Sequence, residues 1–481
     1  MGNVMKSFIR IVCAGAFFFG SSLFAQNSRY ELGQHLRAFE QEFAKHKDNK
    51  ESRKRVVPLL WKATPYFFTA RWGDAARVLD DAKFALTSEK KRPQHLLWAE
   101  SLRIQPTRRI YATNTTSLSI KLSQFYKIDK SAPNQYQIRM TLFSPSGKPQ
   151  TKLRILNSPP LDQVYTRKIH DISQGDYELR IEMLVKGTPL TKESIGISFV
   201  TNLEDRLKKL DEHIRQLPDQ PNSLESGTLR ELTRILHRLN GSGLETDYPG
   251  ARLLEEAEGI IKAIRTKKTY YGPGMSGQHW IRLPTQRGNI VARIFVPKNL
   301  DKSKPVPTVV ALHGAGTTEN MFFDAYGLGK IVDLCRQRGW LLIAPRSPPF
   351  SFRSPTPAII DAFAERYPVD KSQVFVVGHS MGAAQAVTAA QEAPDRFAAI
   401  AALAGSSRVN SKVDANLQEV PFFVGVGNRD FALEGSQRLA KNLKEKKIRT
   451  VQYREYPDIE HVTIVQTALP DVFAFFDKQV K

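Results

Sequence analysis

A serine stands between two glycines where a strand-like run passes into a helix-like run. Residues 374–377 read Val-Phe-Val-Val, residues 378–382 read Gly-His-Ser-Met-Gly, and an alanine-rich stretch continues to residue 393. Strand, Gly-x-Ser-x-Gly and helix in this order make a turn so tight that larger side chains would collide across it. The turn lifts the Ser380 hydroxyl above the sheet, at the positive end of a helix. The pattern predicts that Ser380 is a nucleophile; without the flanking elements it would indicate only a tight turn.

A general base and an acid are expected to follow the serine along the chain. His461 is the only histidine after His379, and it lies between a strand-like run at 451–456 and the last helical stretch. Asp430 ends the apolar run that starts at residue 422. An acid there could hydrogen-bond the imidazole, fix its tautomer and stabilise the imidazolium. We therefore predict a Ser380, Asp430 and His461 triad.

Three other acids compete with Asp430 for this role: Glu434, Asp458 and Glu460. Neighbours on one loop usually face in different directions, so Asp430 is preferred, and Glu434 and Asp458 are expected at the surface or in a helix cap. Asp370, before the strand that leads to the serine, is expected in a turn or cap.

A second motif precedes the serine. The apolar run 308–312 ends in His313-Gly314-Ala315-Gly316. Backbone N–H groups of Ala315 and Met381 are predicted to bind the oxyanion of a tetrahedral intermediate, each donor contributing ~10²–10³ in rate. His313 comes before the nucleophile and is expected to shape the loop rather than to act as the base.

Aromatic residues after this motif are candidates for a substrate pocket. Phe322, Phe323 and Tyr326, with the loop 346–353, are predicted to bind substrate, and ordinary core packing is the alternative for the aromatics.

The elements around these motifs alternate. Short apolar runs between residues 290 and 426 are separated by helical stretches, for example 329–338 and 435–446. Short apolar strands alternating with longer helices predict an α/β fold, with a mostly parallel sheet covered by helices on both faces.

These motifs carry a resemblance. Residues 271–481 resemble a serine hydrolase of the α/β-hydrolase superfamily, on the evidence of 313–316, 378–382, Asp430 and His461. They are most similar to compact esterases related to dienelactone hydrolases, polyester depolymerases and phospholipase/carboxylesterases, and also to prolyl oligopeptidase catalytic domains. Serine at 380 departs from the cysteine of true dienelactone hydrolases, and the absence of a preceding propeller pattern weakens the oligopeptidase reading.

The rest of the chain divides by pattern and resembles no family that we recognise. Residues 26–107 are predicted to be helical, with Leu32, Leu36, Phe39 and Phe43 on one face. Residues 108–200 alternate between apolar and polar, which predicts a β-sandwich-like domain of immunoglobulin type. Residues 201–270 are predicted to be a helical linker region, ahead of the catalytic domain at 271–481.

The first 25 residues are typical of an export signal. Lys6 and Arg10 precede an apolar run that ends at Ala25 and is shorter than the roughly 20 residues needed to span a bilayer. Cleavage after Ala25 would remove Cys13 and leave Cys335 as the only cysteine. A retained membrane anchor is the alternative. We expect an exported protein, periplasmic or secreted, whose stability does not depend on internal disulfides.

Composition narrows the classes further. The 481 residues are 41% hydrophobic and 25% charged, as expected of a soluble globular protein. The net charge of +22 is spread over the chain, and no nucleic-acid-binding motif accompanies it, so we expect no nucleic-acid partner. Two cysteines exclude a disulfide framework, a cysteine-ligated zinc site and an iron–sulfur cluster.

The sequence thus predicts a serine esterase that acts through an acyl-enzyme on a small-molecule or polymeric ester, without a cofactor, a metal or stable membrane insertion. A serine peptidase and a non-catalytic binding protein with a decayed hydrolase domain are the alternatives. The substrate, the oligomeric state and the role of residues 26–270 are left open.

Overall fold

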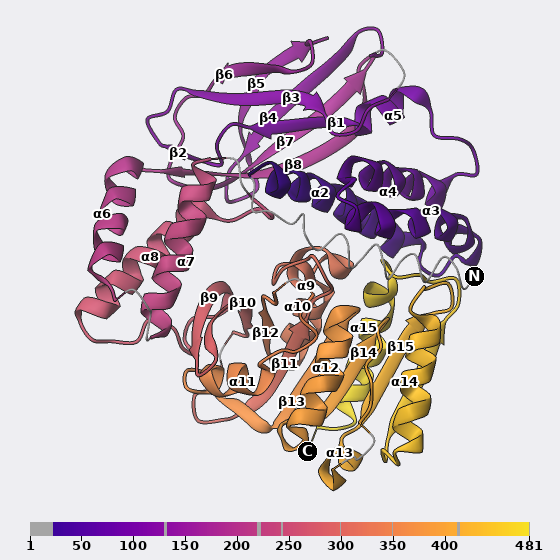
Figure 1. Ribbon diagram of the computed structural model, residues 1–481. Helices are drawn as coiled ribbons and strands as arrows, with labels where there is room; N and C mark the ends of the chain where they lie inside the picture. The colour runs from indigo at the N-terminus through magenta and orange to yellow at the C-terminus, as the bar shows by residue number, and fades with distance from the viewer. Residues whose placement is uncertain are drawn as a thin grey trace.

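The computed structural model has four regions: N-terminal helices, a β-sandwich, three connecting helices and a C-terminal α/β domain (Figure 1). The structure describes residues 23–128, 132–218, 223–241, 244–298, 300–348, 350–410 and 414–480, with side chains from residue 28 onward. Residues 1–22, which include most of the predicted signal and Cys13, lie outside this description. In Figure 1 a β-sandwich lies at the top and the C-terminal sheet at the bottom, with the N-terminal helices between them.

The N-terminal region is helical, as predicted. Its elements are α2 (Leu23–His46), α3 (Lys50–Phe68), α4 (Trp72–Thr87) and α5 (Gln94–Glu100). The side chain of Asn49 accepts the Ser52 N–H at 3.1 Å, which satisfies one free donor at the start of α3. Phe39 and Phe43, two members of the predicted apolar face of α2, are almost completely buried.

Two antiparallel-rich sheets follow and pack face to face. One sheet has the order β1-β3-β6 and the other β2-β8-β7-β4-β5, with a shared core between them. The first strand begins at Leu102, ahead of the predicted start of the sandwich at 108. The strands are β1 (Leu102–Pro106), β2 (Ile110–Ala112), β3 (Ser117–Gln124), β4 (Tyr136–Phe143), β5 (Pro149–Asn157), β6 (Gln163–Lys168), β7 (Gly175–Val185) and β8 (Thr188–Val200).

Three helices connect the sandwich to the C-terminal domain, on the left in Figure 1. They are α6 (Leu203–Gln216), α7 (Leu224–Leu239) and α8 (Gly250–Arg265). Reciprocal hydrogen bonds between Ser223 and Ser226 form a capping box that starts α7. Leu229, Leu232 and Leu236 of α7 belong to the same buried cluster as the strands of the C-terminal sheet, so these helices form part of its cover.

The C-terminal domain contains an eight-stranded sheet in the order β16-β15-β14-β13-β11-β12-β10-β9. All neighbouring pairs from β12 through β16 are parallel, and β10 is antiparallel to both of its neighbours. The predicted α/β fold is therefore confirmed. The strands are β9 (Gly277–Thr285), β10 (Gly288–Val296), β11 (Val306–Leu312), β12 (Leu341–Pro345), β13 (Val369–His379), β14 (Ala399–Leu403), β15 (Phe422–Gly427) and β16 (Val451–Tyr456).

Helices and short 3₁₀ segments connect these strands. They are α9 (Met321–Asp324), η1 (Tyr326–Leu328), α10 (Lys330–Arg338), α11 (Thr356–Ala364), α12 (Met381–Glu392), η2 (Pro394–Arg396), α13 (Ala415–Glu419), α14 (Leu433–Glu445) and α15 (Ile464–Asp477).

Alternate residues of the central strands enter two different cores. Val374 and Val376 pack with α7, α8 and α12 on one face of the sheet. Phe375 and Val377 pack on the other face, in a cluster that also contains α10, α15 and the apolar residues of α2, α3 and α4. Because successive side chains on a strand point to opposite faces, this division follows directly from the period of two. The N-terminal helices therefore share a hydrophobic core with the C-terminal domain.

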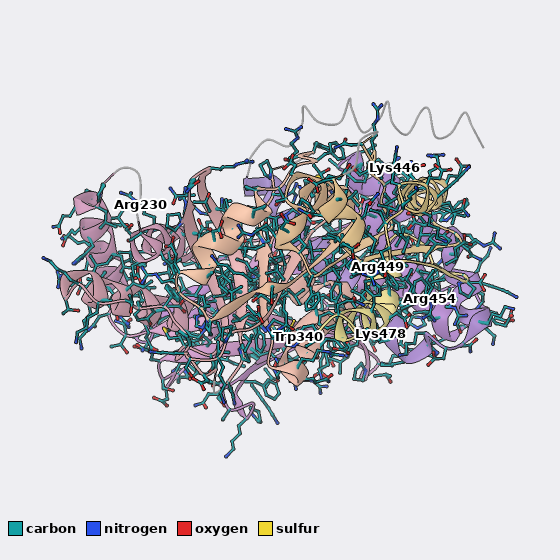
Figure 2. All side chains as sticks on the ribbon, turned by 90° about the horizontal axis from the view of Figure 1, so that it is seen from below. Arg230, Trp340, Lys446, Arg449, Arg454 and Lys478 are labelled. Carbon is teal, nitrogen blue, oxygen red and sulfur yellow. The ribbon has the colours of Figure 1, made fainter. Side chains whose placement is uncertain are left out.

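Charged side chains are distributed along the whole outline of the molecule in Figure 2, where Arg230 and Lys446 are well separated. None of the described helices is long and apolar enough to cross a membrane.

Candidate active site

The turn that carries Ser380 has the geometry that its glycines predict. β13 ends at His379, α12 begins at Met381, and Ser380 between them has φ 56° and ψ −113°. A Cβ on Gly378 would lie 2.0 Å from the Gly382 carbonyl oxygen, and one on Gly382 would lie 2.0 Å from the Leu312 oxygen. Real side chains cannot approach so closely, so both positions require glycine. The Ser380 N–H donates to the Leu403 oxygen at 2.9 Å, which fixes the strained residue against β14.

Asp430 and His461 are hydrogen-bonded to each other. His461 Nδ1 lies 3.1 Å from both carboxylate oxygens of Asp430, whose side chain is fully buried. Asp430 Oδ1 also accepts the Ala432 N–H at 2.8 Å, which orients the carboxylate. Burial by itself lowers the pKa of His461, but the adjacent Asp430 charge and hydrogen bond outweigh it, and the pKa is raised. An Nδ1–H that donates to Asp430 leaves Nε2 available as a base.

The competing acids have other contacts. Glu434 is exposed and pairs with Arg438 at 3.6 Å. Asp458 is buried in a turn at φ 53°, which corrects our expectation of a surface or cap position. Glu460 accepts the N–H groups of Val462 and Thr463 at 2.9 and 3.1 Å, ahead of α15. Within the described residues none of the three is hydrogen-bonded to the His461 ring.

Ser380 and His461 line the same pocket. Among the described residues, Ser380 Oγ has no hydrogen-bond partner, and it is therefore not hydrogen-bonded to His461. In free enzymes the hydrogen bond between the nucleophile and the base is often long and tightens only when substrate binds. The lack of a Ser380–His461 hydrogen bond is therefore compatible with proton transfer.

The loop after β11 lies directly beside the serine. A Cβ on Gly314 would be 3.6 Å from Ser380 Cβ, and Gly314, Ala315 and Gly316 all line the pocket. Neither the Ala315 N–H nor the Met381 N–H donates to another group in the described part of the chain. Both N–H groups are therefore available to bind an oxyanion, and their role in an oxyanion hole stays a prediction.

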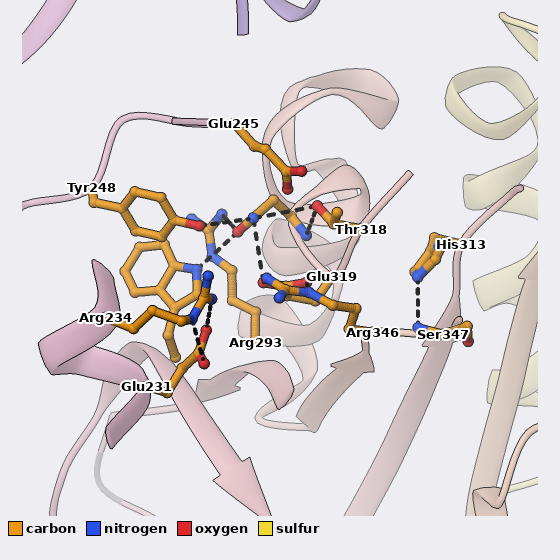
Figure 3. A network of polar contacts seen from close by, with 12 residues as sticks. Glu231, Arg234, Glu245, Tyr248, Arg293, His313, Thr318, Glu319, Arg346 and Ser347 are labelled. Atoms are coloured by element: carbon orange, nitrogen blue, oxygen red, sulfur yellow. Dashed lines mark hydrogen bonds and ion pairs between the residues drawn. The ribbon is translucent and has the colours of Figure 1, made fainter. Parts of the chain in front are cut away.

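His313 holds this loop in place. It is buried, its Nδ1–H donates to the Gly314 oxygen at 2.9 Å, and its Nε2 accepts the Ser347 N–H at 3.0 Å (Figure 3). Burial lowers its pKa, so the ring is neutral. In the same view Arg346 binds both oxygens of buried Glu319 at 2.6 and 2.5 Å. The predicted structural role of His313 agrees with these contacts.

A hydrogen-bond chain that sequence reasoning missed connects this loop to His461. Tyr326 Oη donates to His379 Nδ1 at 2.6 Å, and His379 Nε2–H donates to the His461 carbonyl oxygen at 3.1 Å. Tyr326 Oη would lie 3.3 Å from a Cβ on Gly314, so Tyr326 lies directly beside this loop. Burial and the neighbouring His461 hold the pKa of His379 well below its usual value, so the ring is neutral. No sequence signal pairs residues 326 and 379.

The pocket has a volume of about 200 Å³ and is mainly apolar. Of the predicted substrate-binding aromatics, only Tyr326 lines it. Phe322 and Phe323 are buried in the core shared with the sheet, which corrects their assignment. The described residues of the loop 346–353 do not line the pocket either. The opposite wall comes from α2, α3 and α4, a contribution that sequence reasoning also missed.

Within the described residues, no three His, Cys, Asp or Glu side chains are grouped so that they could hold a metal ion.

Comparisons with known proteins concern mainly the C-terminal domain. Residues 307–460 match the family model for the alpha/beta hydrolase fold. Among curated proteins no match is found.

Similar solved structures include a ferulic acid esterase, with 17% identity over 43% of this chain and 99% of that one, at a TM-score of 0.38. The fluorophosphonate-binding serine hydrolase FphF of Staphylococcus aureus has 16% identity over 43% of this chain and 99% of its own, at a TM-score of 0.36. A thermostable esterase has 16% identity over 79% of this chain and 99% of its own, at a TM-score of 0.38.

Proposed function

We propose that the chain, whose residues 307–460 match the alpha/beta hydrolase fold, is a serine esterase with Ser380, Asp430 and His461 as its triad. The observation that carries the proposal is the Asp430–His461 contact beside a strained Ser380, on the wall of a single pocket.

In the proposed reaction, Ser380 Oγ attacks the ester carbonyl while His461 Nε2 takes its proton. Asp430 holds the imidazole in the required tautomer and stabilises the imidazolium that forms. The N–H groups of Ala315 and Met381 bind the oxyanion until the alcohol leaves with the proton from His461. Water, activated by the same histidine, then hydrolyses the acyl-enzyme and releases the acid.

The pocket favours a small-molecule ester over a polymeric one. Its volume of about 200 Å³ is below the usual range for drug-sized ligands, and the N-terminal helices close one side of it. Apolar walls favour an acyl or leaving group that is itself largely apolar.

A fluorophosphonate probe tests the nucleophile directly. We expect the probe to label Ser380, and Ser380→Ala to lose both labelling and about 10⁴–10⁶ in kcat towards 4-nitrophenyl esters. Ser372→Ala is the matched control, because Ser372 is an exposed residue near the other end of β13. Near-normal turnover by Ser380→Ala would refute the proposal that Ser380 is the nucleophile.

A parallel panel of peptide amides tests the peptidase alternative. Faster turnover of amides than of esters would favour a peptidase, whereas no labelling and no turnover of either would favour a decayed binding protein.

We also propose that the chain is exported. The basic residues, the apolar run and Ala25 support a cleaved signal. N-terminal sequencing of the exported fraction should give a mature start near Gln26; an intact Met1 on cytosolic protein would contradict it.

A further inference from the structure

The N-terminal helices supply one wall of the pocket that contains Ser380. Leu32 and Leu36 come from α2, Phe67 and Phe68 from the end of α3, and Leu79 from α4. In Figure 1 these helices lie against the C-terminal domain near α9 and α15. A group bound beside Ser380 therefore meets side chains that the hydrolase domain itself does not contain.

Arg37 interrupts this apolar wall. It is half-buried, it lines the pocket, and its Cζ lies 6.0 Å from the centre of the Tyr30 ring. Its Nη2 is buried without a hydrogen-bond partner. In the described part of the chain no carboxylate lies within ion-pair distance of Arg37.

Gly33 is the small residue closest to this guanidinium on the pocket side of α2. It lies one turn before Arg37 on α2 and also lines the pocket, and a Cβ there would be 3.5 Å from Arg37 Nη1. Glycine inside a helix costs about 1 kcal/mol relative to alanine. A Cβ at this position would make only an ordinary van der Waals contact with Arg37, so Gly33→Ala tests whether the space beside the guanidinium is used by a ligand.

The positive charge of Arg37 in the pocket favours a ligand group with one negative charge. Leaving the buried Nη2 of Arg37 without a hydrogen-bond partner is unfavourable, and a bound carboxylate would accept charge-assisted hydrogen bonds from this guanidinium. The other arginine in the lining, Arg29, already faces Glu245 at 3.5 Å. Asp324, which also lines the pocket, is paired with Arg293 at 2.8 Å, so Arg37 is the positive charge of the lining that is left without an ion pair among the described residues. A single unpaired positive charge matches a carboxylate better than a phosphate dianion.

We infer that the esterase acts on a largely apolar ester that carries a carboxylate group, and that Arg37 recognises this carboxylate as a specificity-determining residue. The inference rests on the proposed function, and it deepens that function by naming the substrate class.

Two pairs of esters test it. The first places the carboxylate in the acyl part: 4-nitrophenyl adipate monoester against neutral 4-nitrophenyl 6-methylheptanoate, with the spontaneous rate subtracted. The second places it in the leaving group: 4-carboxyphenyl hexanoate against neutral 4-acetylphenyl hexanoate. The measured quantity is the ratio of kcat/KM for the charged ester to that for the neutral one.

We expect wild-type protein to favour the charged member of one pair, and Arg37→Met to lower that ratio by about tenfold to a hundredfold. Arg37→Lys should keep part of the preference. Lys45→Met, which removes an exposed positive charge from the same helix, should keep all of it. Turnover of the neutral esters reports that each variant is folded.

The inference is overturned if Arg37→Met changes the ratio by less than fivefold in both pairs while the neutral esters are still hydrolysed. Retained activity in Ser380→Ala, or no turnover of any ester by wild-type protein, would instead refute the proposed function.

Discussion

Removing the charge of Asp430 should cripple the reaction and shift its pH dependence. In Asp430→Asn the side chain keeps its shape, but the carboxylate whose oxygens lie 3.1 Å from His461 Nδ1 becomes neutral. Unit charges about 4 Å apart interact by about 4 kcal/mol at an effective dielectric constant of 20. Each 1.36 kcal/mol is tenfold in rate, so losing this stabilisation of the imidazolium lowers kcat by about 10³. An amide that favours the wrong tautomer extends the loss to about 10⁴.

The pH profile gives a second, independent readout. Asp430 raises the pKa of His461, and catalysis needs the neutral imidazole, so wild-type kcat/KM increases only as pH rises through that raised value. Without the carboxylate the imidazole stays neutral to lower pH. The acidic limb of the Asp430→Asn profile should therefore move to lower pH.

Initial rates on a 4-nitrophenyl ester between pH 5 and 9, with circular dichroism to match folding, measure both effects. Glu434→Gln and Asp458→Asn are the controls, and each should cost less than about tenfold. An Asp430→Asn variant within tenfold of wild type would refute the assignment of the acid, and a loss of rate with an unmoved acidic limb would refute the electrostatic reasoning.

Three further substitutions test the surroundings of the triad. Tyr326→Phe leaves His379 Nδ1 without its donor and should lower the free energy of unfolding by about 1–3 kcal/mol in urea titration; an unchanged midpoint would contradict this. Gly382→Ala places a Cβ 2.0 Å from the Leu312 oxygen, so soluble yield and melting temperature should fall sharply, and a wild-type melting curve would show that the elbow is less tight than described. Glu460 has a pKa raised to about 7, mainly by burial, so wild-type stability falls as pH rises from about 4.5 to 7, where the unfolded chain is ionised and the folded one is not. Glu460→Gln should therefore gain stability relative to wild type between pH 5 and 8; a constant difference between their melting temperatures would oppose that reasoning.

The position of the proposed triad at the ends of strands could be predicted from sequence, but the residues that line the pocket could not. Gly378, Ser380 and Gly382 belong to one local turn. The proposed nucleophile, acid and base then follow one another along the chain in the order of the strands β13, β15 and β16. The alternation of short apolar strands with longer helices likewise predicted a sheet covered on both faces. These features could be predicted because each of them depends on residues that are close to one another in the sequence.

Phe322 and Phe323 show where local pattern fails. An aromatic after the oxyanion loop packs equally well into a core or a pocket, and only the long-range position of α2 and α15 decides between them. The same holds for Leu32 and Leu36, whose helical spacing predicts an apolar face but not which surface covers it. Arg37 carries no signal at all, because a single arginine on a helix is usually solvated.

The contact of α2 with α15 joins the two ends of the polypeptide. Gln466 Nε2 donates to Glu40 Oε2 at 2.6 Å and to the Glu40 carbonyl oxygen at 3.0 Å, across 426 positions of sequence. Closing so long a loop costs more conformational entropy than closing the shorter loops between paired strands of the C-terminal sheet. The contact between α2 and α15 should therefore form late in folding and open early in unfolding. Cleavage after Ala25 leaves it intact, whereas a proteolytic cut within α2 would disrupt a helix whose Phe39 and Phe43 are buried in the core shared with the C-terminal domain. Arg37 therefore lies on a helix whose packing also contributes to the core behind the sheet, so loss of α2 would affect the stability of the C-terminal domain as well as its pocket.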